Sequence, residues 1–286
     1  MYDWHQYNEK LVRRGEILIS DDVLQNWDKE LAAMNRKKEG RRFVFPESFM
    51  KIVGYARVYF GLPYRQTEGL LRTYGNTIPK IPDYTAIHKR VNRLDIRINP
   101  KVGNDIVIAV DSTGIKVANR GEWRRQAWQM RRRFLKIHVG VDIDSKKIVA
   151  LKVTNDRTYD GIHLSSLVKS AQKRAHVTKV LADAAYDAKY NFSYLCHYNI
   201  VPGIKVKNNP YTTAGQNHPR RIHASLQHSN YKRWCHSVSY GKRWIIESVF
   251  SAFKRTFGEY VMAHKRQNME KELALKVSLY NRFMGG

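Results

Sequence analysis

The chain has 286 residues, 43% of them hydrophobic and 12% aromatic, and this composition excludes an intrinsically disordered protein. Its 51 Lys and Arg residues outnumber 25 Asp and Glu residues, and the formal net charge of +26 is spread from Arg13 to Arg282. A distributed excess of this size predicts a long polyanionic partner, and the lack of an amphipathic anchor or lipidation motif disfavours a membrane surface.

The compartment is inferred from the cysteines and the apolar runs. Cys196 and Cys235 have no metal-type spacing and indicate no disulfide framework. The first residues show no signal-peptide pattern, and no apolar run approaches the ~20 residues that span a bilayer. We therefore expect a cytoplasmic protein.

Residues 1–100 are expected to form a basic, all-helical domain. The apolar run at 49–60 predicts one helix, and residues 63–73 predict a second, shorter one. A third helix is expected over 84–94, with Asp83 as its N-cap.

The third predicted helix is rich in basic side chains. Two short helices, the second of them basic, fit a helix-turn-helix-like DNA-binding unit. The link at 75–82 is long for a strict motif, and a three-helix packing with a basic face explains the pattern equally well. If this helix binds DNA, the expected contacts are His88, Lys89, Arg90 and Arg93.

Residues 101–286 have the pattern of an α/β (α+β) domain. The continuous apolar run at 106–110 is typical of a strand buried on both faces. The later elements expected are strands at 134–143 and 148–153, a helix at 160–175, a strand at 178–182, a helix at 190–198, a strand at 200–206 and a helix at 240–260. This order matches an RNase H-like mixed five-stranded sheet flanked by helices.

Two carboxylates directly end apolar runs. Asp111 follows Ile-Val-Ile-Ala-Val, and Asp183 follows Lys-Val-Leu-Ala. A buried, isolated carboxylate is costly unless it is neutralised or paired, and a divalent cation would pair it. Capping of a strand end explains each residue as well. Asp187 competes with Asp183, which is preferred because it ends its run directly.

The helix expected at 240–260 carries a third carboxylate. At about 100° per residue, one arc of roughly 60° holds Tyr240, Arg243, Glu247 and Lys254. The adjoining arc, expected to face the core, holds Ile246, Val249, Phe250, Phe253 and Phe257. Such a stripe can hold a metal ligand and present cations to phosphates, although a solvated basic face accounts for it too.

The stripe also carries a family resemblance. Tyr240-x2-Arg243-x3-Glu247-x6-Lys254 resembles the Y-R-E-K signature of DDE insertion-sequence transposases of bacteria and archaea, in groups four and five and closest to group five. Asp111-Ser-Thr-Gly resembles the first acidic motif of that family. Asp183-Ala-Ala-Tyr-Asp resembles the second, in which Gly often stands where this chain has Ala184.

The resemblance covers nearly the whole chain, since residues 7–15 and 62–69 also look like the N-terminal region of that family. Only 63 residues separate Asp183 from Glu247, so no large inserted β-domain fits between them.

The resemblance implies a DNA transposase that cuts the end of its element and joins the exposed 3′-hydroxyl to target DNA. Asp111, Asp183 and Glu247 would hold two Mg²⁺ ions, for which Mn²⁺ can substitute. The DNA-contacting residues would be Tyr240, Arg243 and Lys254, with Trp244 either stacked on a base or packed in the core.

The implied partners are double-stranded DNA, as terminal inverted repeats and target, and further copies of the chain in a homodimer or larger assembly. The implied setting is the prokaryotic cytoplasm, at the nucleoid when bound. Residues 120–133, with Trp123 and Trp128, are a second candidate DNA grip or a solvated loop.

Two other functions stay open. One is an RNase H-like structure-specific endonuclease that cuts but never joins. The other is a catalytically idle DNA-binding relative, against which the intact acidic triad argues.

Overall fold

The computed structural model describes residues 3–16, 21–117, 134–207 and 217–285. The chain divides into two compact units, one of Met1–Arg97 with Met262–Gly286 and one of Ile98–Val261. The expected division was a helical region at 1–100 and a catalytic domain at 101–286, so the structure differs in where it places the C-terminal segment. Within the described ranges, no helix has the length and apolar character needed to cross a membrane.

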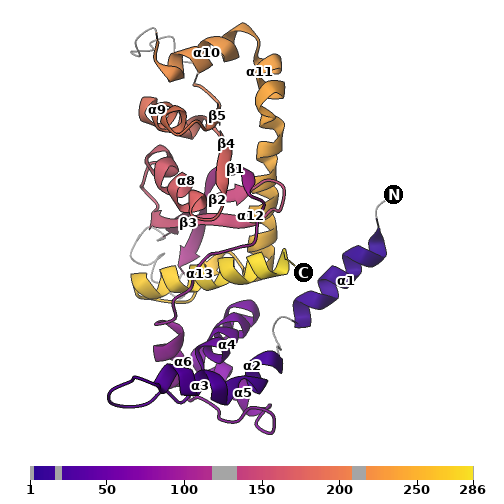
Figure 1. Cartoon of the computed structure of the whole chain (residues 1–286), viewed down its shortest axis with the longest axis vertical. Helices are drawn as coiled ribbons and strands as arrows, with labels where there is room; N and C mark the ends of the chain where they lie inside the picture. The colour runs from indigo at the N-terminus through magenta and orange to yellow at the C-terminus, as the bar shows by residue number, and fades with distance from the viewer. Residues whose placement is uncertain (1–2, 17–20, 118–133, 208–216, 286) are drawn as a thin grey trace, which may run out of the picture. The chain divides into compact units, whose positions relative to one another are not determined.

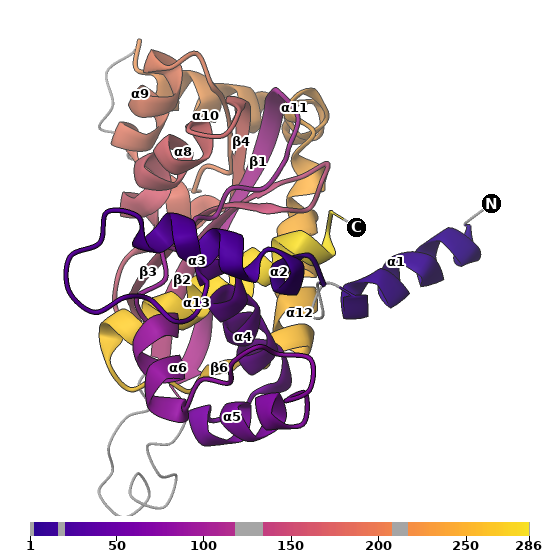
Figure 2. The same cartoon turned by 60° about the horizontal axis from the view of Figure 1, so that its bottom comes forward.

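The first unit is helical throughout its described part (Figure 2). Its helices are α1 (Trp4–Glu16), α2 (Asp21–Gln25), α3 (Trp27–Asn35), α4 (Glu47–Phe60), α5 (Tyr64–Arg72), α6 (Tyr84–Val91) and α13 (Arg266–Phe283). The predicted cap of α6 is confirmed, because the Asp83 carboxylate accepts from the amides of Thr85 and Ala86. α4 ends at Gly61, whose φ of 64° is a left-handed value that glycine adopts readily.

The C-terminal segment belongs to this unit because α13 packs on α4 around a buried ionic cluster. The Glu272 carboxylate lies 3.7 Å from Arg57 and 3.5 Å from Lys276, and all three side chains are almost fully buried. Glu272 also accepts from the amides of Met262 and Ala263, at 3.0 Å each at the shortest. The sequence pattern at 240–286 did not reveal this long-range pairing.

The second unit is built on a mixed sheet. Its strands are β1 (Asp105–Val117), β2 (Phe134–Asp142), β3 (Ile148–Asn155), β4 (His176–Ala182), β5 (Val201–Ile204) and β6 (Tyr260–Val261). The order is β3-β2-β1-β4-β5, with β2 antiparallel to β1 and β3, and with β4 and β5 parallel to β1. This is the predicted RNase H-like arrangement. The described sheet has six strands instead of five, because the short β6 pairs with the end of β1.

Helices cover both faces of the sheet, with α8 and α9 on one face and α12 on the other (Figure 1). The helical elements of this unit are η1 (Asp160–His163), α8 (Leu164–Gln172), η2 (Ala184–Tyr186), α9 (Lys189–His197), α10 (Pro219–Ser229), α11 (Tyr231–Val238), η3 (Tyr240–Arg243) and α12 (Trp244–Phe257). The helix expected at 240–260 is thus a 3-10 turn followed by a shorter α-helix.

The helices α10 and α11 were not predicted: both are amphipathic, but they are short, basic and of low mean hydropathy. Each is started by a local cap: His218 accepts from the amide of Arg220, and Asn230 accepts from the amide of Arg233. Capping side chains supply the hydrogen bonds that the first turn of a helix lacks.

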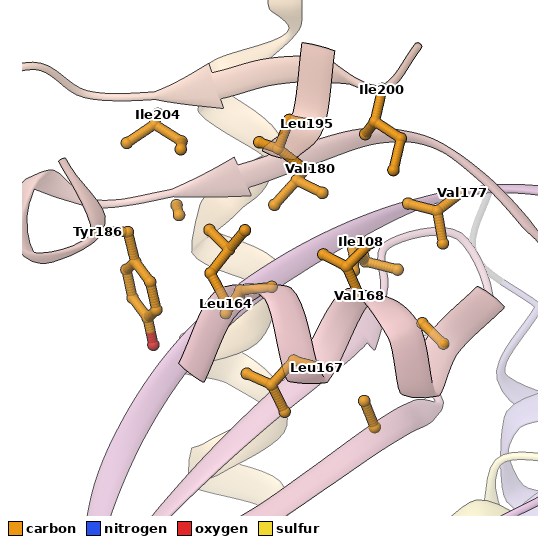
Figure 3. Packing of buried hydrophobic residues seen from close by; sticks show 14 of the residues in the cluster. Ile108, Leu164, Leu167, Val168, Val177, Val180, Tyr186, Leu195, Ile200 and Ile204 are labelled. Atoms are coloured by element: carbon orange, nitrogen blue, oxygen red, sulfur yellow. The ribbon is translucent and has the colours of Figure 1, made fainter. Parts of the chain in front are cut away.

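The main hydrophobic core of this unit lies between the sheet and α8 and α9 (Figure 3). Ile108 and Val180 of neighbouring strands contribute to it, together with Leu164 and Leu167 of α8. Tyr186 of η2 closes one end of the cluster, so the turn that follows β4 is fixed to the core.

Candidate active site

The sheet register places Asp111 and Asp183 next to each other. β1 and β4 are parallel, and Val110 of β1 pairs with Ala182 of β4. Asp111 directly follows Val110 and Asp183 directly follows Ala182, so the two aspartates lie at neighbouring positions. β4 ends there, while β1 continues six residues beyond Asp111 to Val117. The Asp183 carboxylate accepts from the amide of Ala185 at 2.9 Å and caps η2.

The side chain of Arg243 bridges the carboxylates of Glu247 and Asp111. The Arg243 guanidinium lies 2.7 Å from a Glu247 carboxylate oxygen and 3.5 Å from an Asp111 oxygen. Glu247 lies in the first turn of α12, and its side chain is 60% exposed against 23% for Asp111. In the described part of the chain, no three His, Cys, Asp or Glu side chains are close enough together to hold a metal ion.

The environment of Asp111 disfavours the charged form of its carboxylate. Burial, as the largest cause, and the negative charges of Asp183 and Asp160 raise its pKa to about 6, against the lowering effects of the Ser112 amide and Arg243. Carboxylate oxygens whose negative charge is not fully compensated are suitable ligands for a hard divalent cation. The donor chemistry is therefore suitable for a metal, although Arg243 lies between two of the carboxylates.

Asp111→Asn is expected to stabilise the metal-free protein at pH 8. The folded-state pKa is raised above the unfolded value, so the carboxylate favours folding only while protonated, and this contribution is lost as the pH rises through about 6. The melting temperature of the variant minus that of wild type should therefore increase between pH 5 and pH 8 in chelator-treated protein. A pH-independent difference would contradict this assignment.

Asp187, the competitor of Asp183, is occupied elsewhere. Its side chain is 1% exposed and makes two 2.6 Å contacts with the Arg220 guanidinium. It also accepts from the Lys207 amide at 2.9 Å. Because Asp187 is almost fully buried and all its described contacts are with the protein, Asp183 is favoured as the residue available for chemistry.

The stripe on the last helix is divided between two elements. The Tyr240 hydroxyl, in η3, donates to the Ala182 carbonyl at 3.4 Å beside Asp183. The side chain of Trp244 is 59% exposed, so its core alternative is excluded, and Lys254 is half-buried. The predicted core face of the helix is confirmed, since all its members are buried: Ile246, Val249, Phe250, Phe253 and Phe257.

The basic side chains of α6, and that of Arg93 just beyond its end at Val91, differ in their surroundings. Lys89 and Arg93 are exposed, and His88 is exposed with its ring 5.0 Å from that of Tyr64. Arg90 is turned towards the protein: it lies 4.5 Å from the Phe43 ring and donates to the Phe45 carbonyl. Arg90 therefore has partners within the protein, and its role in DNA contact stays a prediction. The second candidate DNA-binding segment, residues 120–133, lies outside the described residues.

A polar cluster beside the acidic pair was not predicted. Asp160, at the start of η1, lies 2.7 Å from Lys136 and 3.2 Å from the buried His138. The available signal was in β2, where Lys136 and His138 alternate within an otherwise apolar strand and therefore share one face.

The sheet order and the adjacent carboxylates define the class, an RNase H-like domain with an acidic site. A family model described as a transposase DDE domain matches residues 103–282, and another with the same description matches residues 12–120. The chain therefore belongs to the DDE transposase family. This family generally uses divalent metal ions.

Solved structures with low similarity to this chain include three assemblies. A chain of the simian T-cell lymphotropic virus intasome complex with PP2A regulatory subunit B56 gamma is 13% identical, with a TM-score of 0.31, covering 80% of this chain and 65% of that one. The Drosophila P element transposase strand transfer complex has 11% sequence identity and a TM-score of 0.36, and the match covers 91% of this chain and 70% of that one. The piggyBac transposase synaptic complex with hairpin DNA has 10% sequence identity and a TM-score of 0.32, and the match covers 96% of this chain and 80% of that one.

Proposed function

We propose that this chain cuts the end of an insertion sequence and transfers the exposed strand to target DNA, with Asp111, Asp183 and Glu247 as the catalytic carboxylates. The observation that carries this proposal is the adjacency of Asp111 and Asp183 at neighbouring strands, with Glu247 joined to Asp111 through Arg243. When bound, two Mg²⁺ ions, or Mn²⁺ in their place, would activate the attacking oxygen and stabilise the leaving one.

In this proposal Arg243 has two partners. Without DNA it pairs with Asp111 and Glu247. If the carboxylates held divalent cations, its guanidinium would be free to contact a DNA phosphate. Arginine suits this exchange because its planar donors match carboxylate and phosphate alike. Tyr240 and Lys254 would contact phosphates nearby, and the exposed Trp244 would stack on a base.

We further propose membership of the Y-R-E-K insertion-sequence transposases, closest to group five. The spacing of Tyr240, Arg243, Glu247 and Lys254 supports this assignment. The partners would be double-stranded DNA, as terminal inverted repeats and target, and a homodimer or larger assembly that holds two ends. The reaction would take place in the prokaryotic cytoplasm at the nucleoid.

We propose that α5 and α6 bind DNA in a helix-turn-helix-like manner. A groove of about 600 Å³ separates them, with Arg65, His88 and Lys89 among its lining residues. Lys89→Ala and Arg93→Ala should each weaken DNA binding and reduce the slope of log K against log salt by about 0.9. Fluorescence anisotropy at several salt concentrations measures this slope.

The control for this titration is Arg97→Ala, which removes the same charge from an exposed pair with Asp95. Arg97→Ala should leave the slope at its wild-type value. Equal slopes for all three variants would remove α6 from the DNA interface. Arg90→Ala should instead lower the melting temperature, since Arg90 holds α6 to the segment that contains Phe43.

A strand-transfer assay tests the proposed reaction. Pre-cut element ends, supercoiled target and Mg²⁺ should give joined products with wild-type protein. Cutting without joining would favour the structure-specific endonuclease, and DNA binding without turnover at any divalent ion would favour an idle relative.

A further inference from the structure

The Tyr186 hydroxyl is a buried hydrogen-bond donor without a partner. Its ring is fully buried at one end of the core, and its hydroxyl lies at the end of the ring away from Ile204 (Figure 3). The hydroxyl makes no hydrogen bond within the described residues. Buried polar groups are nearly always paired, so an orphaned donor points to a bound species or a functional role.

The surroundings of this hydroxyl are acidic. Burial raises the pKa of Tyr186 above its ordinary value, and the negative charges of Asp160, Asp111 and Asp183 raise it further. The hydroxyl therefore keeps its proton at physiological pH and can act only as a neutral donor or acceptor there.

The position of Tyr186 is fixed by close packing between η1 and η2. A Cβ atom on Gly161 would lie 2.7 Å from the Tyr159 ring and 3.0 Å from the Ala185 carbonyl, so the close approach of η1 to η2 disfavours any larger residue there. Asn191 donates to the carbonyls of Gly161 and Tyr186, at 2.9 Å each, and joins the two turns. The backbone of Tyr186 is thus tied to η1, while its ring is packed in the core.

Asp160, the carboxylate at the start of η1, is also held by its neighbours. Asp160 is held by Lys136 at 2.7 Å, and His138 of the same cluster is hydrogen-bonded to Thr154 at 2.8 Å. These contacts of Asp160 are with residues of β2 and do not involve Asp111 or Asp183. Its negative charge adds to that of Asp111 and Asp183, as the shared effect on Tyr186 indicates.

We propose that Tyr186 is a positioning residue of the acidic centre, whose hydroxyl donates to the carboxylates at the ends of β1 and β4, directly or through one water, when they hold a divalent cation. This inference rests on the proposed function of Asp111 and Asp183. Residues that hydrogen-bond to metal-ligating carboxylates orient them, and their loss typically weakens metal binding by about 10- to 100-fold.

The test is Mn²⁺ binding without DNA, measured by electron paramagnetic resonance of the free ion, for wild type and Tyr186→Phe. We expect affinity at least roughly tenfold weaker in the variant. The melting temperature of the metal-free variant should be unchanged or higher, because an unpaired buried hydroxyl is removed. A merely structural role would lower the melting temperature.

The matched control is Tyr194→Phe. Tyr194 also has a buried hydroxyl without a hydrogen bond among the described residues, but its pKa is raised by burial and by Tyr198, with no carboxylate involved. Tyr194→Phe should bind Mn²⁺ as wild type does.

Equal Mn²⁺ affinity in wild type and Tyr186→Phe would overturn this inference alone, as would a lower melting temperature of the metal-free variant. Failure of wild type to bind Mn²⁺ would overturn the proposed metal role of the carboxylates, and this inference with it.

Discussion

Replacing Asp111 or Asp183 by alanine, or Glu247 by glutamine, is expected to abolish DNA strand cleavage while DNA binding is largely retained. Metal ions supply several kcal/mol of transition-state stabilisation, so loss of one ligand should slow cleavage by ~10³-fold or more. Binding should persist because it depends on the basic residues, which far outnumber the acidic ones. Gel assays of end cleavage and of binding, run on the same protein samples, measure the two effects separately.

The control is Asp156→Asn, which removes an exposed carboxylate just after β3. It changes the net charge as much as a substitution in the acidic site and should leave cleavage unchanged. Retained Mg²⁺-dependent cutting in any one of the three variants would remove that residue from the catalytic set.

Glu272→Ala is expected to destabilise the first unit by about 3–5 kcal/mol, because it leaves the buried Arg57 and Lys276 without their counter-charge. It also removes the acceptor for the amides of Met262 and Ala263. Burial already lowers the pKa of Lys276, so loss of the carboxylate favours its deprotonation. Urea unfolding followed by circular dichroism measures the change.

Glu270→Ala is the matched control, two residues earlier on α13. Its 2.7 Å pair with Arg266 is partly exposed, with side chains 47% and 37% accessible, so its loss should cost no more than about 1 kcal/mol. Equal effects of the two substitutions would show that the buried cluster does not hold α13 to α4.

Local pattern was enough to predict most strands and the core face of α12. Apolar runs identify buried strands, and helical spacing identifies which residues face the sheet. Asp111 and Asp183 could be selected because each directly follows such a run. Their adjacency was expected from the RNase H-like order and is given by the pairing of Val110 with Ala182.

Contacts between distant segments could not be predicted in this way. The two-residue β6 has too few residues for a periodic signal, and α13 joins the first unit through Glu272 and Arg57, which lie far apart in the sequence. Arg90 had the charge expected of a DNA-binding residue, but Phe43 and Phe45 engage its side chain. Tyr186 lies in the Asp183-Ala-Ala-Tyr-Asp segment, and only the three-dimensional packing shows that its hydroxyl is buried without a hydrogen-bond partner among the described residues.

The central claim is that Asp111, Asp183 and Glu247 together hold divalent cations. Iron-directed cleavage of the polypeptide tests it most directly, with Fe²⁺ in place of Mg²⁺ and with ascorbate and peroxide to generate radicals at the bound metal. We predict cuts beside residues 111, 183 and 247 that excess Mg²⁺ suppresses and that Asp111→Ala abolishes. Cuts at Asp187 in place of Asp183, or a pattern unaffected by Mg²⁺, would contradict the account.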